Sequence, residues 1–302
     1  MGKRALITGV QGFTGYYLAA ELEQAGYEVF GVGHTPRASN NAGVRAVYAC
    51  DLGDAAGLTR VIKEVQPDVV AHLAAIAFVA HGDVEAIYRT NLIGTRNLLE
   101  ALSQADKPLE AVLLTSSANV YGNATGGMLD ESTAPAPAND YAVSKLSMEY
   151  MASLYSTRLP IIIARPFNYT GVGQSENFLL PKIVNHVRRA APLLELGNLN
   201  VARDFSDVRT VVQYYRLLLE NSSSHGEIYN VCSGLAYTLD EVLNMVRAIS
   251  GHAFEVRVNP AFVRENEVKI LIGSCAKLQT TVGEVADISL ADTLRWMIEA
   301  KD

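Results

Sequence analysis

A tyrosine and a lysine one helical turn apart are the residues whose types and spacing first indicate chemistry in this chain. Tyr141 and Lys145 lie in the run Tyr-Ala-Val-Ser-Lys, which places a phenol and an ammonium on one face of a predicted helix. A free tyrosine has a pKa of about 10, and a fixed ammonium nearby favours the phenolate and draws that pKa toward neutral pH. Because surface Tyr/Lys pairs share this spacing, the pair alone indicates an acid–base group and does not yet define a site.

A pair of serines at the end of a predicted strand strengthens this interpretation. The strand at 111–115 is followed directly by Ser116 and Ser117. In a parallel sheet the carboxyl ends of the strands form the edge at which ligands bind. A hydroxyl at that edge can hydrogen-bond a reacting carbonyl or alcohol oxygen. Serine, tyrosine and lysine together therefore predict a catalytic set.

A glycine-rich loop near the start predicts a dinucleotide site. Gly9, Gly12 and Gly15 follow a strand at 4–8 and open a helix at 13–25. Glycines permit the tight turn and the close approach of backbone to a pyrophosphate, and a helix N-terminus favours the anion. We expect Phe13 and Thr14 to belong to the same cofactor site.

The end of the second strand bears on the choice of cofactor. An acidic residue there would bind the ribose 2′-hydroxyl and repel a 2′-phosphate, but the chain has His34 and Arg37 and no Asp or Glu. The sequence therefore favours NADP(H) and leaves NAD(H) open. Asp51 and Leu52, after the third strand, are candidate adenine contacts, although Asp51 could instead cap the following helix.

Alternating strands and helices must position these groups. Strands are predicted at 4–8, 28–32, 46–49, 69–73, 111–115 and 161–165, and helices at 13–25, 55–65, 84–103 and 141–156. This alternation predicts right-handed crossovers and an α/β fold with a doubly wound parallel sheet, the Rossmann arrangement. We assign residues 1–165 to this dinucleotide-binding domain. Residues 166–302 should form mainly a smaller lobe that binds the substrate, with some segments returning to the first domain.

Composition and charge exclude other classes of protein. The chain has 302 residues, of which 49% are hydrophobic and 19% charged, enough for a large buried core. A net charge of −7 disfavours nucleic acid and anionic membranes as partners. No apolar run approaches the roughly 20 residues that span a bilayer, so a cytoplasmic protein is expected. The three cysteines and six histidines lack metal-ligand spacing, so no metal site is predicted.

Together these motifs resemble the extended short-chain dehydrogenases/reductases, the family of nucleotide-sugar epimerases, dehydratases and reductases. The likeness lies in the glycine loop, Asp51-Leu52, His72-Leu73-Ala74-Ala75, Asn91, Ser117, Tyr141/Lys145 and Arg165-Pro166-Phe167-Asn168. It implies that Tyr141 is the acid–base, that Lys145 also binds the nicotinamide ribose, and that Ser117 orients the substrate. It further implies cofactor contacts from Leu73, Ala74, Ala75 and Asn91.

The residues beside Ser117 help to separate the reactions of this family. The dehydratases resemble the chain but carry Glu two residues after this position, where the chain has Asn119, which cannot act as a base. A 4-epimerase with tightly bound NAD usually has an acid after the second strand, and this chain lacks one, so epimerase activity stays as the alternative. A non-catalytic dinucleotide sensor is disfavoured because Tyr141 and Lys145 are both present.

Within the family, the likeness points to reductases of GDP-linked 4-keto-6-deoxy sugars. The segments that carry it are 164–174, 203–208, 229–234, 259–260, 264–267 and 271–274. It implies hydride transfer to C4 of a GDP-4-keto-6-deoxy-hexose, giving GDP-D-rhamnose or its C4 epimer. Arg203 and Arg264 can grip a diphosphate and Glu267 can accept from a ribose or base, with Asn168 and Lys182 as weaker candidates. Relatives suggest a homodimer that pairs the helices at 84–103 and 141–156.

Overall fold

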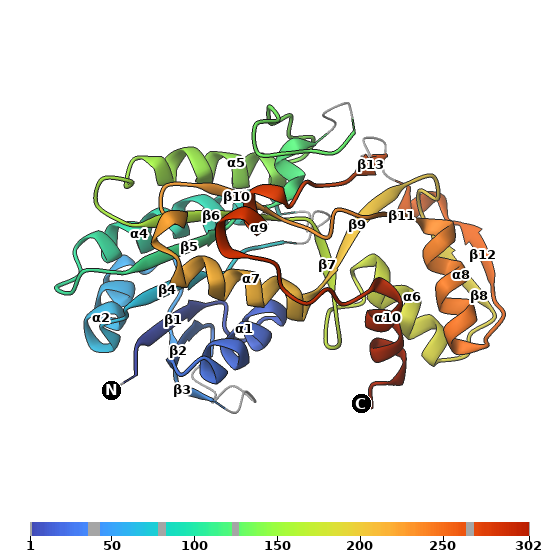
Figure 1. Ribbon diagram of the computed structural model, residues 1–302, viewed down its shortest axis with the longest axis horizontal. Helices are drawn as coiled ribbons and strands as arrows, with labels where there is room; N and C mark the ends of the chain where they lie inside the picture. The colour runs from blue at the N-terminus through green and yellow to red at the C-terminus, as the bar shows by residue number, and fades with distance from the viewer. Residues whose placement is uncertain (1, 36–42, 78–82, 123–126, 264–268, 302) are drawn as a thin grey trace.

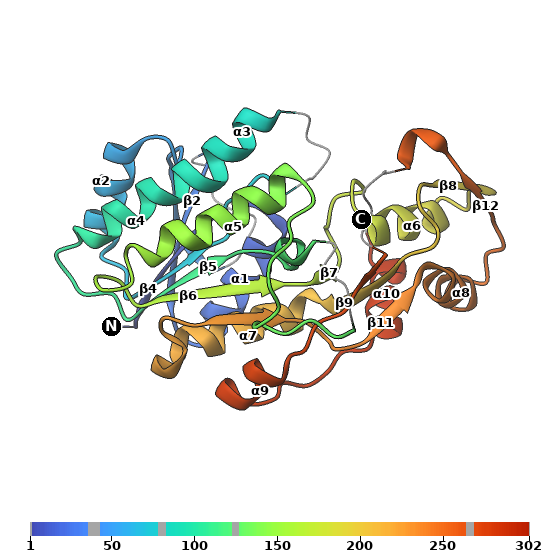
Figure 2. The same ribbon diagram turned by 90° about the horizontal axis from the view of Figure 1, so that it is seen from above.

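The larger of two lobes is built on a parallel sheet (Figures 1 and 2). The computed structural model describes residues 2–35, 43–77, 83–122, 127–263 and 269–301. Its main sheet has seven strands in the order β10-β6-β5-β4-β1-β2-β3. The strand order reverses between β1 and β4, and a crevice for ligands lies beyond the carboxyl ends of strands at such a switch point.

The strands of this sheet are β1 (Arg4–Thr8), β2 (Glu28–Gly33), β3 (Val44–Ala49), β4 (Val69–His72), β5 (Ala111–Thr115), β6 (Ile161–Pro166) and β10 (Ile228–Val231). All neighbouring strands pair in parallel. The predicted doubly wound sheet is confirmed, and its six predicted strands are found with ends shifted by at most two residues. The inner strands β1, β4 and β5 are largely apolar, with polar residues only at their ends, because helices cover both faces.

Each face of the sheet packs against its own layer of helices. One layer holds α1 (Phe13–Gln24), α7 (Val208–Glu220) and α9 (Ala276–Val282), and the other holds α2 (Ala55–Val65), α4 (Thr95–Ser103) and α5 (Asp140–Ser153). Alternate residues of β1 divide between these layers, Ile7 toward the first and Leu6 toward the second. Both side chains are at most 1% exposed. Full burial of such a side chain stabilises the fold by about 1.5–3 kcal/mol.

The segment 84–103 departs from the predicted single helix. It consists of α3 (Val84–Tyr88), a π-helical turn η1 (Arg89–Gly94) and α4. The prediction of one continuous α-helix is therefore wrong in its middle. The wider turn coincides with Asn91, whose side chain bonds to the backbone of Ile76 and to Ser144 of α5. Single π-turns inside α-helices often mark functional sites.

The smaller lobe has its own core. A four-stranded sheet contains β7 (Asn168–Thr170), β9 (Ala202–Asp207), β11 (Ala236–Thr238) and β13 (Ile270–Leu271), and β8 (Leu193–Leu196) pairs with β12 (Glu255–Val258). Helices α6 (Leu179–Arg188), α8 (Leu239–Ser250) and α10 (Leu290–Glu299) pack their apolar faces together. Short turns η2 (Ala118–Tyr121), η3 (Ser222–Ser224) and η4 (Pro260–Phe262) complete the described elements.

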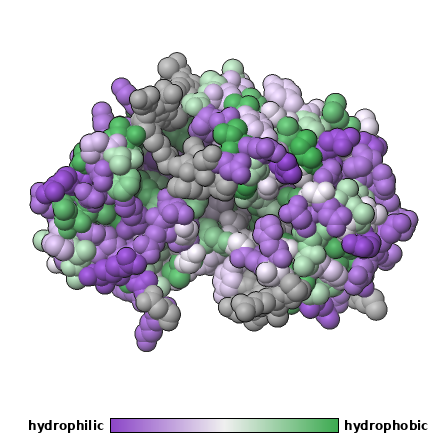
Figure 3. Space-filling view, turned by 180° about the vertical axis from the view of Figure 1, so that it is seen from behind, coloured by the Kyte–Doolittle hydropathy of each residue, from purple (hydrophilic) through white to green (hydrophobic). Residues whose placement is uncertain are grey.

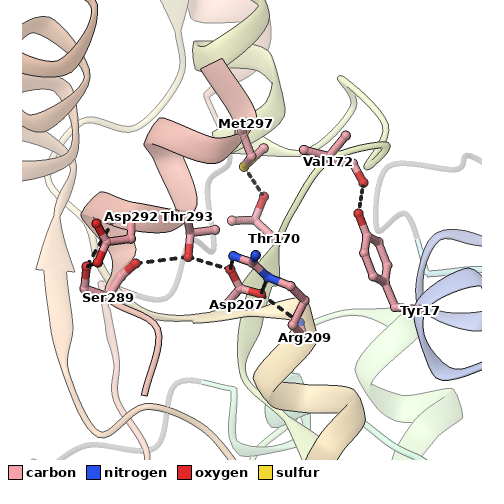
Figure 4. A network of polar contacts seen from close by, with 9 residues as sticks. All are labelled: Tyr17, Thr170, Val172, Asp207, Arg209, Ser289, Asp292, Thr293 and Met297. Carbon is pink, nitrogen blue, oxygen red and sulfur yellow. Dashed lines mark hydrogen bonds and ion pairs between the residues drawn. The ribbon is translucent and has the colours of Figure 1, made fainter. Parts of the chain in front are cut away.

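A polar network ties α10 and the loop after β7 to the larger lobe (Figure 4). Asp207, which caps α7, binds the Arg209 guanidinium through both of its oxygens and accepts 2.8 Å from the Thr293 hydroxyl of α10. The Tyr17 phenol of α1 donates to the Val172 carbonyl at 2.7 Å. Since α7, α9 and β10 follow residue 165 in sequence and pack on the main sheet, the lobes interlock; the boundary at residue 165 stays a prediction.

In the described ranges, no helix has both the length and the apolar character that crossing a membrane requires.

Candidate active site

The candidate catalytic side chains meet at the carboxyl edge of the main sheet. Tyr141 and Lys145 come from the first turns of α5, and Ser117 follows β5. α5 begins at this edge because Asn139 caps it, accepting from the backbone N–H of Ala142 at 2.9 Å. Figure 3 shows a hollow in the middle of one face, between the larger and the smaller lobe. Two lobes around such a hollow can enclose a cofactor and a substrate together.

The Tyr141 phenol lies in a buried setting that keeps it protonated. The residue is 8% exposed, and burial raises its pKa to about 12, although a hydrogen bond with the Ser117 side chain works against the rise. The lowering of this pKa by Lys145 that the sequence predicts is not found in this structure, because burial dominates and the groups that act on the phenol are Ser117 and Tyr169. At neutral pH the phenol is a proton donor.

Lys145 is held as a cation at the end of β5. Its Nζ donates to the carbonyl oxygen of Thr115 at 2.7 Å, and the residue is 3% exposed. Burial lowers the pKa of the ammonium to about 8, and the charge of Glu149 partly restores it. A lysine with this pKa is mostly protonated at neutral pH and can stabilise negative charge on a phenol that gives up its proton.

The two serines after β5 have different surroundings. The Ser117 hydroxyl accepts from the backbone N–H of Asn119 at 3.2 Å and hydrogen-bonds Tyr141. The Ser116 hydroxyl instead donates to the Glu149 carboxylate, away from the phenol. The structure thus places Ser117, and not Ser116, beside Tyr141.

A buried ion pair that the sequence reasoning missed lies behind Lys145. Arg165 of β6 donates to both carboxylate oxygens of Glu149 at 2.9 and 2.6 Å, and to the Tyr121 phenol at 3.0 Å. Tyr121 in turn donates to Asn230 of β10 at 2.7 Å. Glu149 stands four residues after Lys145, so the helical spacing that linked Tyr141 to Lys145 could have extended the set by one more turn.

The glycine loop fits a dinucleotide. Gly9 has a φ of +72°, and a Cβ at Gly15 would lie 2.3 Å from the Gly9 carbonyl oxygen, so neither position tolerates a side chain. Gly12 precedes the twelve-residue helix α1 without a capping side chain, and the first turn has no acidic residue. The N-terminus of α1 is therefore built to bind a diphosphate through backbone N–H groups and the helix dipole.

Phe13 and Thr14 at the start of α1 both contact Tyr169 of β7. The Phe13 and Tyr169 rings stack with centroids 6.2 Å apart, and the Thr14 hydroxyl lies 2.8 Å from the Tyr169 phenol. The sequence reasoning did not single out Tyr169, although it follows the motif residue Asn168 directly. This contact joins the cofactor loop to the smaller lobe.

The residues near the second and third strands are placed as follows. His34 is exposed just after β2, and its expected partner Arg37 lies outside the described residues. The Asp51 carboxylate accepts from the backbone N–H of Gly53 at 2.7 Å, whereas Asp54 caps α2. Capping by Asp51, one alternative from the sequence, is therefore wrong. Leu52 is buried at 8% exposure.

The loop after β4 packs on the glycine loop. The Ala74 backbone comes so close that a Cβ at Gly9 would lie 2.9 Å from it. Leu73 and Ala75 flank this contact and are partly exposed. Asn91 is 1% exposed and uses its amide to bind Ile76. In this structure Asn91 supports the loop beside the cofactor site.

Three of the predicted substrate residues, Asn168, Lys182 and Arg203, lie in the smaller lobe. The Asn168 amide donates to the Asp204 carbonyl at 3.2 Å, and the Arg203 guanidinium donates to the Ala202 and Lys269 carbonyls at 2.9 and 3.1 Å. The Lys182 ammonium lies 4.0 Å from the centre of the Phe262 ring, and burial lowers its pKa. Arg264 and Glu267 lie outside the described residues.

The part of the chain that the structure describes holds no cluster of three or more His, Cys, Asp or Glu residues that could bind a metal ion.

Comparison with known families covers nearly the whole chain. A family model described as GDP-mannose 4,6 dehydratase matches residues 6–297. The chain belongs to this family. The prediction of a nicotinamide-dependent oxidoreductase of the extended short-chain dehydrogenase/reductase type is confirmed.

Two curated relatives are each 34% identical to this chain over the aligned residues. One is the GDP-6-deoxy-D-talose 4-dehydrogenase of Aggregatibacter actinomycetemcomitans, aligned over 93% of this chain and 91% of the relative. The other is the GDP-6-deoxy-D-mannose reductase of Pseudomonas aeruginosa, aligned over 98% of this chain and 96% of the relative.

Solved structures agree with this assignment. A Burkholderia cenocepacia J2315 protein described as a candidate epimerase superposes with a TM-score of 0.93 at 52% identity and covers 98% of this chain and 97% of its own. The RMD protein of Pseudomonas aeruginosa, in complex with NADPH, superposes with a TM-score of 0.85 at 30% identity, with the same coverage of both chains.

Proposed function

We propose that this protein reduces the C4 ketone of a GDP-linked 4-keto-6-deoxy-hexose, giving GDP-D-rhamnose or its C4 epimer GDP-6-deoxytalose. The names of the two relatives at 34% identity support this substrate class, because one is a reductase for the 6-deoxymannose compound and the other a dehydrogenase for the 6-deoxytalose compound. Those two sugars differ only at C4, and the residues of this chain leave the choice between them open.

The single observation that carries the proposal is the buried phenol of Tyr141, which lies beside Ser117 and one helical turn from Lys145. A bound reduced nicotinamide supplies the hydride for the carbonyl carbon. Tyr141 holds the proton for the carbonyl oxygen, and its pKa of about 12 keeps that proton in place until the oxygen gains charge. Ser117 orients the oxygen, and Lys145 stabilises the phenolate that remains. One hydride and one proton convert the ketone into the alcohol.

The turn after Ser117 supports a reductase over a dehydratase. Elimination of water from the sugar needs a base to remove the C5 proton, and η2 has Ala118 and Asn119 at the positions in question. The backbone N–H of Asn119 donates to Ser117, and its side-chain amide has no basic atom. The described turn after Ser117 therefore has no carboxylate at the two positions where a dehydratase needs its base.

We propose NADP(H) as the preferred cofactor. The described residues at the end of β2, through His34 and Thr35, include no carboxylate that would repel a 2′-phosphate, and the Pseudomonas aeruginosa RMD structure contains NADPH. His34→Asp places there a negative charge that repels the 2′-phosphate. We therefore expect the ratio of kcat/KM for NADPH to that for NADH to fall about tenfold or more, which corresponds to a loss of at least about 1.4 kcal/mol. An unchanged ratio would contradict the proposed role of this position.

The test of the reaction is turnover of a panel of nucleotide sugars. Purified protein is incubated with NADPH and the GDP-, UDP- and dTDP-linked 4-keto-6-deoxy sugars, and the product is identified by NMR. We expect oxidation of NADPH with the GDP compound, and the C4 coupling constants identify the epimer formed. Turnover of UDP sugars alone refutes the proposal.

Two Tyr→Phe variants test the proton donor. Tyr141→Phe removes the proposed donor and should lower kcat by at least about a hundredfold. Tyr215→Phe is the matched control, because the Tyr215 hydroxyl is also buried and has no hydrogen-bond partner among the described residues. Tyr215→Phe should keep wild-type turnover, and both variants should melt near the wild-type temperature. Full activity of Tyr141→Phe refutes the assignment.

A nucleotide-sugar 4-epimerase with tightly bound NAD is the second candidate. The Burkholderia cenocepacia structure at 52% identity, described as a candidate epimerase, favours it. Acid denaturation of the freshly purified protein separates the two functions. Release of about one NAD per chain with turnover of a nucleotide sugar but no net oxidation of NADPH would establish the epimerase.

We also propose a homodimer through the outer face of α3, η1 and α5, which lie side by side in Figure 2. Large apolar side chains are exposed there, including Ile93 at 48%, Tyr150 at 69% and Leu154 at 73%. Light scattering should give twice the chain mass for the wild type and a single chain mass for Leu154→Glu. A wild-type monomer at micromolar concentration contradicts this proposal.

A further inference from the structure

A buried histidine bridges the strand that leads into the cofactor loop and the helix next to the catalytic one. His72, the last residue of β4, places Nδ1 2.7 Å from the hydroxyl of Thr8 at the end of β1. Its Nε2 lies 2.8 Å from the hydroxyl of Thr95 at the start of α4. None of the three residues is more than 2% exposed. The imidazole therefore joins the end of β1, which leads into the glycine loop, to the start of α4.

Further hydrogen bonds extend this bridge to α5. The Thr95 hydroxyl donates to the Asn91 carbonyl at 2.7 Å, and the Asn91 amide donates to the Ser144 hydroxyl at 3.1 Å. Ser144 donates in turn to the carbonyl oxygen of Tyr141 at 2.7 Å. Asn91 lies in the π-turn η1, and its side-chain amide contacts the catalytic helix α5 from there.

The other end of the bridge reaches the cofactor loop. Thr8 directly precedes Gly9, and its hydroxyl oxygen lies 3.2 Å from the backbone N–H of Ala74, which donates to it. Ala74 is also the residue whose backbone packs against Gly9. These hydrogen bonds form two series that meet at Asn91, one ending on its backbone carbonyl and one starting from its side-chain amide, and together they connect the residue before Gly9 with the backbone of Tyr141.

Counting donors fixes the tautomer of the imidazole. A threonine hydroxyl has one proton, and Thr95 donates it to the Asn91 carbonyl. Thr95 must therefore accept from His72, so the proton lies on Nε2. Nδ1 is then the acceptor for the hydroxyl proton of Thr8, whose oxygen accepts from Ala74. Every donation in the series runs in the same direction, from the cofactor loop toward the catalytic helix.

We propose that neutral His72, as the Nε2–H tautomer, is a positioning residue that sets the catalytic helix against the cofactor loop. The proposal rests on the proposed function in one respect. The nicotinamide of a cofactor bound at the glycine loop and the proton held by Tyr141 on α5 must reach the same carbonyl group. Misplacement by about 1 Å can cost about a hundredfold in rate. Burial, with a smaller contribution from Lys145, lowers the pKa of the imidazole to about 3, which keeps it neutral.

The first test is spectroscopic and needs neither cofactor nor substrate. Protein labelled with ¹⁵N-histidine is titrated from about pH 5.5 to about pH 8, a range in which an ordinary histidine changes its charge. We expect His72 to give the shifts of a neutral Nε2–H imidazole throughout. An Nδ1–H tautomer, or titration within this range, overturns the proposal.

The second test breaks the bridge on the side of the catalytic helix. Thr95→Val removes the acceptor for Nε2–H, Thr95→Ser keeps the hydroxyl, and Thr210→Val is the matched control because the buried Thr210 hydroxyl has no partner among the described residues. We expect Thr95→Val to lower kcat about tenfold or more with KM for cofactor and sugar within about twofold. Thr95→Ser should recover most of kcat, and Thr210→Val should match the wild type.

A role in stability alone predicts a different pattern. Thr95→Val would then melt earlier but keep the wild-type kcat well below its melting temperature, and this result overturns the proposal. The fluorescence of bound NADPH, measured without sugar, gives an independent readout of the nicotinamide surroundings, which we expect to change in Thr95→Val and not in Thr210→Val. If the wild type reduces no GDP sugar, the proposed function fails. The fluorescence of bound NADPH and the NMR measurement of the tautomer then still decide the role of His72.

Discussion

Replacing Glu149 by Gln removes one charge of the ion pair behind Lys145 and leaves its shape almost unchanged. The Glu149 and Arg165 side chains are 5% and 4% exposed, and Arg165 donates two hydrogen bonds to the carboxylate. The glutamine retains one acceptor oxygen where the carboxylate had two. The Arg165 guanidinium then stays buried with no anion beside it, because its pKa is far too high for it to lose its proton.

The expected cost follows from this burial. Breaking a buried ion pair by removing one partner costs about 3–5 kcal/mol, whereas replacing both partners by apolar groups of similar volume is often neutral. We therefore expect Glu149→Gln to lower the free energy of unfolding by about 3–5 kcal/mol. The double variant Glu149→Leu/Arg165→Met should lose less than the single one. Removing the carboxylate also lowers the pKa of Lys145 below about 8, because Glu149 raises it now.

The assay is urea unfolding of both variants together with the pH dependence of kcat. Glu85→Gln is the matched control, since Glu85 pairs with Arg89 on the surface with both side chains at least 70% exposed; it should change stability by less than about 0.5 kcal/mol. In Glu149→Gln the alkaline limb of the pH profile should move to lower pH, because Lys145 loses its proton earlier. A loss below about 1 kcal/mol, or a double variant weaker than the single, refutes the reasoning.

Three further predictions concern other residues. The free energy of unfolding of the wild type should fall as pH drops below 6.5, the ordinary pKa of histidine, because a folded pKa of about 3 prevents the protonation of His72 that the unfolded chain allows. His72 contributes up to about 1.4 kcal/mol per pH unit to this fall, which urea midpoints at neutral and acidic pH measure. The same dependence of stability on pH in His72→Gln would contradict it. Asp54→Ala should lower the free energy of unfolding by about 1 kcal/mol because it removes the cap of α2, whereas Asp51→Ala should change this free energy little. Urea midpoints equal to that of the wild type in both variants would show that neither residue caps the helix. Iodoacetamide should modify Cys275 faster than Cys50. A hydrogen bond from the Cys232 thiol lowers the pKa of Cys275 to about 7, whereas burial raises the pKa of Cys50. Peptide mass spectrometry compares the two rates of modification, and equal rates contradict this prediction.

Local patterns determined the parts of the site that depend on neighbours in sequence. The apolar runs around β1, β4 and β5 predicted strands covered on both faces, and the glycine spacing predicted the turn before α1. The four-residue spacing of Tyr141 and Lys145 placed both side chains on one helical face. These features follow from backbone periodicity, which any short segment carries by itself.

Only the tertiary structure decided how these groups behave. The sequence predicted a lowered pKa for Tyr141 from one charge nearby, but the depth of burial determines the outcome, and burial is set by segments far apart in the chain. The π-turn at Asn91 was hidden in a pattern that predicts a continuous helix, because the turn is fixed by bonds to Ile76 and to Ser144, which lies 53 residues away.

The same distinction separates the residue types of the site from their roles. The sequence by itself determined that a serine, a tyrosine, a lysine and a glycine loop would share the carboxyl edge of a parallel sheet. That His72 bridges this edge, and that Glu149 and Arg165 form a buried pair behind Lys145, was decided by folding. Hydrogen-bond partners and local dielectric depend on which distant segments meet, and no local pattern encodes that meeting.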